Sequence, residues 1–85
     1  MNHISDWNQR KREIGMAFLG ESYLPHESDP EQYAALLGRV GATTNRDVSI
    51  LISIVQDAVM TARRDERPTA PLDTFRDWLM NKLME

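Results

Sequence analysis

The segment from about Thr44 to Arg64 carries apolar side chains over more of its circumference than a surface helix requires. At about 100° per residue, its aliphatic side chains form a continuous arc of roughly 200°, whereas a surface helix usually shows a stripe of roughly 100°. The centre of the arc comprises Val48, Leu51, Ile52, Val55, Ala58, Val59 and Ala62, and the arc is widened by Ile50 and Ile54. Such a helix must be covered on two sides, by other helices or by a second chain.

A β-strand is the alternative for this segment, because several of its residues are β-branched. The run Ile50-Leu51-Ile52 breaks the strict alternation of a half-buried strand, and the segment is too long for a typical strand. We therefore predict a helix, whose start is marked by the capping residue types Thr43, Thr44 and Asn45.

Three further helices are predicted around this one. The first begins with Ser5 or Asp6 as its N-cap and ends near Gly20. The second begins at Ser28-Asp29-Pro30-Glu31, a capping sequence, and ends between Gly38 and Gly41. The last runs from about Pro71 to Met84. The apolar stripes of the first and last helices comprise Ile4, Trp7, Ile14, Phe18, Leu72, Phe75, Leu79 and Leu83. The chain is thus predicted to be all-α: one domain, residues 1–85, folded as a compact four-helix bundle around the apolar third helix, with a short second helix.

Composition narrows the classes of function. The chain has 85 residues, of which 41% are hydrophobic and 27% charged, and it has no cysteine, so disulfides and cysteine-ligated metal sites are excluded. No apolar run approaches the roughly 18 residues that span a membrane, and the N-terminus lacks the order of a signal peptide. The formal charge of −3 gives no general attraction to nucleic acid. We expect a cytoplasmic protein without a membrane partner.

No motif for catalysis or cofactor binding is visible. The one metal site that the sequence suggests would use His26 with Glu27 or Asp29, and a solvated acidic loop is the simpler interpretation of that stretch. No spacing pairs a nucleophile with a base, and the glycines are not grouped in a phosphate-binding loop. We therefore expect no enzymatic activity and no cofactor.

Protein binding is the leading functional hypothesis. Phe75, Trp78 and Met80 cover more than one face of the last helix, and tryptophan and methionine are common at binding surfaces. Ile50 and Ile54 could form a stripe for self-association, giving a homodimer, unless they lie in the core. The expected function is a non-enzymatic regulator, inhibitor or assembly factor that binds another protein, a class common among small bacterial and phage accessory proteins.

DNA binding is the alternative hypothesis. The second helix, a short turn and the third helix superficially resemble a helix-turn-helix, with Thr43, Thr44, Asn45 and Arg46 placed to contact bases and phosphates. Against this, the third helix is mostly apolar, and Asp47 beside its one arginine would repel phosphate. We therefore place nucleic acid behind protein as the expected partner.

Overall fold

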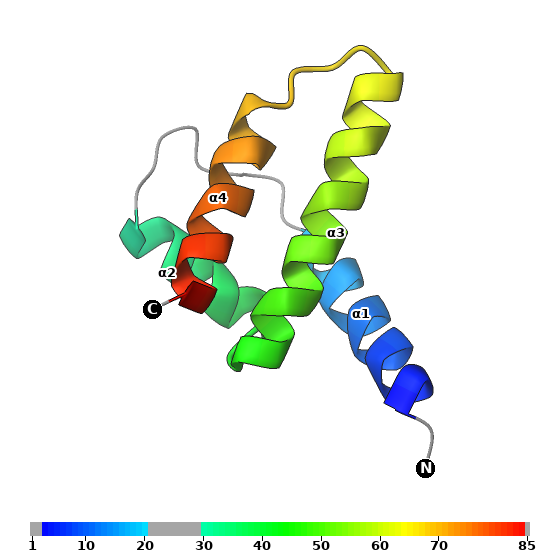
Figure 1. Cartoon of the computed structure of the whole chain (residues 1–85), viewed down its shortest axis with the longest axis vertical. Helices are drawn as coiled ribbons and strands as arrows, with labels where there is room; N and C mark the ends of the chain where they lie inside the picture. Colours follow the sequence, from blue (N-terminus) through cyan, green and yellow to red (C-terminus); the bar gives the residue numbers. More distant parts are fainter. Residues whose placement is uncertain (1–2, 21–29, 85) are drawn as a thin grey trace.

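The fold is a bundle of four helices arranged around the third. In the computed structural model, which describes residues 3–20 and 30–84, the helices are α1 (His3–Leu19), α2 (Pro30–Val40), α3 (Asn45–Arg64) and α4 (Ala70–Met84). Helices α1 and α4 both pack on α3 and lie on different sides of it (Figure 1). The predicted all-α four-helix bundle with a central third helix and a short second helix is confirmed.

The start of α3 follows from its sequence. Thr44 is the N-cap in extended conformation, and its hydroxyl accepts a hydrogen bond from the backbone N–H of Asp47 at 3.1 Å. This bond satisfies one of the amides that every helix N-terminus leaves without a partner. The predicted start at the threonine pair is therefore confirmed.

Two helices end in the same hydrogen-bonded motif. At the end of α2, Ala42 N–H donates to the carbonyl of Leu37 at 2.9 Å, and Gly41 has a φ of +77°. At the end of α3, Arg67 N–H donates to the carbonyl of Ala62 at 2.7 Å, and Glu66 has a φ of +59°. Both are Schellman motifs, in which the residue after the C-cap is left-handed. The position suits Gly41, whereas Glu66 adopts it at a steric cost.

The start of α1 differs from the prediction. The helix begins at His3, so Ser5 and Asp6 lie within it and neither is the N-cap. Asp6 is in the first turn, where the helix dipole favours a carboxylate. Aspartate therefore suits the first turn as well as the N-cap. The predicted cap of the second helix, Ser28 and Asp29, lies outside the described residues. The predicted ends near Gly20 and Gly41 and the span of the last helix are confirmed within about one residue.

Helices α1 and α4 together cover the broad apolar arc of α3. Along α3, Val48, Ile50, Leu51, Ile54, Val55, Val59 and Ala62 are buried. The Ile54 side chain faces α1 at Gly15, where a Cβ would lie 3.7 Å from Ile54 Cδ1. On the other side, Phe75 and Leu79 of α4 are buried in the same core. The width of the arc is thus explained by two helices that pack on one.

An aromatic cluster joins the remaining elements. Phe75 stacks with Phe18 of α1 and Trp78 of α4, with ring centroids 6.2 and 6.3 Å apart. Tyr33 of α2 contacts both Phe75 and Trp78, at 5.0 and 5.2 Å. Stacked and tilted rings at these separations are favourable arrangements. The cluster therefore ties α1 and α2 to α4. Among the described helices, none has the length and apolar character needed to cross a membrane.

Candidate protein-binding groove

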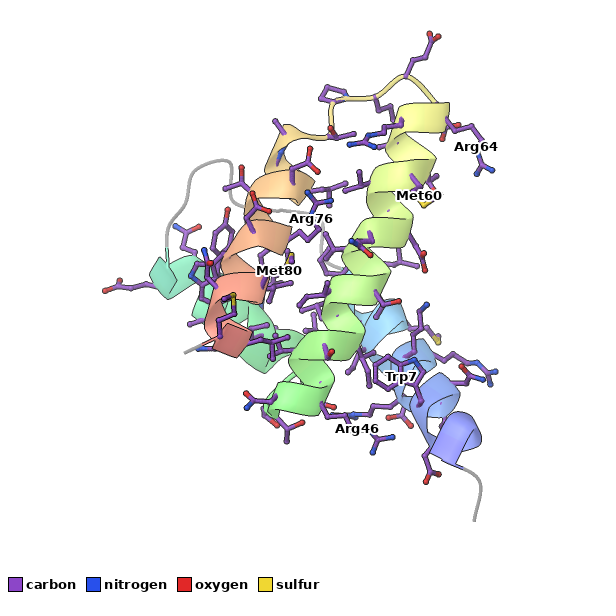
Figure 2. The ribbon with its side chains drawn as sticks, in the orientation of Figure 1. Trp7, Arg46, Met60, Arg64, Arg76 and Met80 are labelled. Carbon is purple, nitrogen blue, oxygen red and sulfur yellow. The ribbon has the colours of Figure 1, made fainter. Side chains whose placement is uncertain are left out.

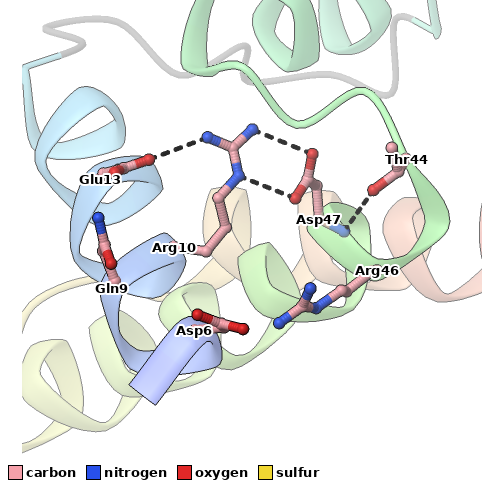
Figure 3. A pocket seen from close by; sticks show the side chains of 7 residues that line it. All are labelled: Asp6, Gln9, Arg10, Glu13, Thr44, Arg46 and Asp47. Carbon is pink, nitrogen blue, oxygen red and sulfur yellow. Dashed lines mark hydrogen bonds and ion pairs between the residues drawn. The ribbon is translucent and has the colours of Figure 1, made fainter. Parts of the chain in front are cut away.

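A partly buried ion pair fixes α1 against the start of α3. The Arg10 guanidinium donates from Nε to Asp47 Oδ1 and from Nη2 to Asp47 Oδ2, both at 3.1 Å (Figure 3). Arg10 also donates to the backbone carbonyl of Gly41 at 2.7 Å and to the carboxylate of Glu13 at 3.1 Å. One guanidinium thus joins α1, the end of α2 and the start of α3.

Asp47 is well satisfied although only 5% of its surface is exposed. Besides the bidentate pair with Arg10, its carboxylate accepts the backbone N–H of Thr43 at 3.3 Å. The Arg10 hydrogen bonds lower the pKa of Asp47, against the opposing effect of burial. The same contacts raise the pKa of Arg10. Asp47 is therefore a charged carboxylate with a structural role.

A polar hollow of about 530 Å³ lies beside this pair. Its lining includes Asp6 and Glu13 of α1 together with Arg46 of α3, and Figure 3 shows Asp6 and Arg46 on facing sides of it. A phosphate approaching Arg46 would meet the carboxylate of Asp6 (Figure 3). The hollow is thus unfavourable for a nucleic-acid backbone.

A second hollow, which we call the α1–α3 groove, lies between the C-terminal halves of α1 and α3. It has a volume of about 510 Å³. Its walls are formed by Lys11, Arg12, Gly15, Met16, Phe18 and Leu19 of α1 and by Ile54, Asp57, Ala58 and Thr61 of α3. Gly15 and Ile54 lie at the close approach of the two helices, so they form its floor. Arg67 completes the lining.

Large apolar side chains stand open to solvent at this groove. Met16 is 70% exposed and Leu19 is 80% exposed, although both belong to the helix that supplies Ile14 to the core. Met60 is also exposed and lines an adjoining hollow that shares Asp57 and Thr61 with the groove. Figure 2 shows Met60 and Arg64 on the side of α3 away from α4. Apolar surface therefore continues from the groove along α3.

The polar edge of the groove helps to hold it in shape. Lys11 Nζ donates to Ser53 Oγ at 3.1 Å and lies 3.2 Å from Asp57 Oδ2. These contacts cross from α1 to α3, as does the ion pair of Arg10 with Asp47. Arg10 and Lys11 thus both link α1 to α3 before any partner arrives.

The residues predicted to bind a partner on the last helix occupy different environments. Phe75 is fully buried in the aromatic cluster, and Trp78 is half-buried against Tyr33, with Lys82 Nζ 5.4 Å from its ring centroid. Met80 is 47% exposed. Of this trio, Met80 is the one exposed side chain, whereas Phe75 and Trp78 contact each other in the aromatic cluster.

Both residues of the predicted self-association stripe are buried within the chain. Ile50 is fully buried and Ile54 is nearly so, on the floor of the groove. The four residues of the DNA-binding alternative, Thr43, Thr44, Asn45 and Arg46, are all exposed at the start of α3. His26, Glu27 and Asp29 lie outside the described residues. Within the described ranges, no group of three or more histidines and carboxylates is placed to hold a metal ion.

Met16 and Leu19 are not among the residues predicted from the sequence to bind a partner. A signal was present, since Arg12, Met16 and Leu19 are spaced i, i+4 and i+7 and so share one face of α1. That face lies beside the core stripe of Ile14 and Phe18, and its two apolar residues were too few to be distinguished from scattered surface residues.

Comparisons of the chain with protein-family models, with characterised proteins and with solved structures give no match. Function is therefore inferred from the geometry of the α1–α3 groove.

Proposed function

We propose that this chain is a binding protein that regulates, inhibits or assembles another protein by receiving part of it in the α1–α3 groove. The observation that carries the proposal is the apolar groove itself, with Met16 and Leu19 exposed on its wall and Ile54 on its floor. Exposed apolar patches around a hollow are typical of protein-interaction sites. We also propose that the protein is non-enzymatic and works in the cytoplasm. The absence of cysteine is compatible with that reducing compartment, where proteins rarely rely on disulfides.

The groove supports this function better than the surface of α4. In α4, Phe75 is packed against Phe18 and Trp78, so binding through it would require the core to open. The walls of the α1–α3 groove need no such change, because Met16 and Leu19 already face solvent. A preformed surface binds with a smaller loss of conformational entropy.

Site-specific photocrosslinking tests the proposal. A photoreactive amino acid replaces Leu19 in the groove, Met80 on α4 or Ala34 on the exposed face of α2. We expect a discrete crosslinked protein from position 19 in the native host, and none from position 34. Adding Met16→Ser should weaken the crosslink from position 19. A crosslink from position 80 alone would move the binding surface to α4, and no discrete crosslink at any position would contradict the proposed function.

A further inference from the structure

Positively charged side chains predominate at the edge of the α1–α3 groove. Its lining holds three basic side chains, Lys11, Arg12 and Arg67, and a single carboxylate, Asp57. Asp57 is already paired with Lys11 at 3.2 Å. Arg64, in the adjoining hollow, adds a further exposed cation. This edge is therefore positive, although the whole chain has a formal charge of −3.

Arg12 and Arg67 remain available for a partner. Arg12 is exposed and has no ion pair or hydrogen bond with any residue in the described ranges. Arg67 has a contact of 3.5 Å with Asp65, and both of these side chains are more than half exposed. Such exposed pairs contribute little and exchange easily.

We propose that the occupant of the groove is an amphipathic helix of a partner protein whose apolar face is flanked by acidic side chains. The inference rests on the proposed function and specifies the chemistry of the partner. Leucine-sized side chains at i, i+4 and i+7 would fill the space between Met16, Leu19 and Ala58, while flanking carboxylates would pair with Arg12 and Arg67.

The length of the groove suits a short helix. Its α1 wall runs from Lys11 to Leu19, about 12 Å or two helical turns, and its α3 wall from Ile54 to Thr61 is similar in length. A surface of this size belongs to a small, transient interface, in which rim charges raise the rate of association and select the partner.

Two other occupants fit the surface less well. A second copy docked symmetrically on the same groove would bring Arg12 and Arg67 of both chains close together, so like charges would oppose the pairing. An anionic membrane would attract the cations, but Gly15 and Ile54 lie at the bottom of a hollow that a flat bilayer surface cannot fill, and the net charge of the chain is negative.

Binding of designed peptides to the full chain tests this inference. Three fluorescent peptides of about 14 residues, or roughly four helical turns, are compared. The first has leucines at i, i+4 and i+7 with glutamate on both flanks, the second has lysine in place of glutamate, and the third is a scrambled form of the first. We expect the glutamate peptide to bind roughly tenfold more tightly than the lysine peptide, with an affinity that falls as salt increases. The scrambled peptide should bind no better than the lysine peptide.

Charge reversal in the protein provides the matched control. Arg12→Glu and Arg67→Glu should each weaken binding of the glutamate peptide roughly three- to tenfold. Arg46→Glu makes the same charge change outside the groove and should have no more than a twofold effect, as long-range screening predicts. Unfolding curves of all three variants check that the fold is intact.

Each other outcome overturns the inference in a recognisable way. Equal binding of the glutamate and lysine peptides would contradict an acidic partner. The proposed function would still be supported by the crosslink from position 19. Binding to anionic vesicles that Arg12→Glu abolishes, without peptide binding, would identify a membrane surface. A dimer in sedimentation that Met16→Ser dissociates would identify a second copy as the occupant.

Discussion

At the scale of single residues, Asp47 is the one charged side chain that is buried among the described residues. Its carboxylate is nearly buried and is held by Arg10, whose own side chain is 38% exposed. Replacing Asp47 by asparagine removes the charge and one strong acceptor but keeps the shape. Because Arg10 is partly hydrated, we expect Asp47→Asn to lower the free energy of unfolding by about 1–2 kcal/mol near neutral pH.

The pH dependence of that difference follows from the lowered pKa of Asp47. A carboxylate whose pKa is lower in the folded state stabilises the fold at pH values above its ordinary pKa of 3.8. This contribution is lost as the pH falls below 3.8 and through the lower pKa of the folded state. Urea unfolding of the natural chain and of Asp47→Asn should therefore give free energies that converge in acid. A constant difference across this range would show that the ion pair is not its source. Asp57→Asn, at an exposed carboxylate, is the control and should change the free energy by less than about 0.5 kcal/mol.

At the scale of the helices, the two Schellman motifs differ in one residue. Gly41 holds the left-handed position after α2, and Glu66 holds the same position after α3. The left-handed conformation costs a residue with a Cβ about 1 kcal/mol. Glycine avoids this cost, but it loses more conformational entropy on folding, which offsets part of the gain. We expect Glu66→Gly to raise the free energy of unfolding by about 0.5–1 kcal/mol. Gly41→Ala is the reciprocal variant and should lower it by about 1 kcal/mol. Thermal and urea unfolding measure both, and a destabilised Glu66→Gly would contradict the assignment of strain to Glu66.

Local signals explain which helix boundaries the sequence could predict. Thr44 as a cap and Gly41 as a terminator act through hydrogen bonds within a few residues, so their effect is readable from the chain alone. The start of α1 was misplaced because Asp6 is equally suitable as a cap and as a first-turn residue. The pairing of Arg10 with Asp47 joins residues far apart in sequence, and spacing carries no signal for it.

At the scale of the whole molecule, the candidate site also depends on contacts between residues far apart in the sequence. The arc of α3 predicts that something must cover Ile50 and Ile54. The structure buries Ile50 in the core and places α1 over Ile54 at Gly15. A helical wheel of α4 cannot show that Phe18 packs on Phe75 and Tyr33 on Trp78, so the sequence alone does not separate a binding surface from a core contact. The groove appears only once α1 and α3 are placed side by side, since neither wall is concave by itself.

Apolar side chains that hold the fold and apolar side chains that are open for binding should differ in what their loss costs. Met16 and Leu19 are mostly exposed, so the double variant Met16→Ser/Leu19→Ser should change the free energy of unfolding by less than about 1 kcal/mol. Phe75→Ala, which empties a fully buried site, should cost about 3–5 kcal/mol. The double variant should also reduce the fluorescence of an apolar dye bound to the folded protein, because it removes the exposed wall of the groove. Met80→Ser, at the exposed methionine of α4, controls for the loss of any surface apolar group. If Met80→Ser lowered dye binding more than the double variant, the main open apolar surface would lie on α4, and the α1–α3 groove would lose the observation that supports it.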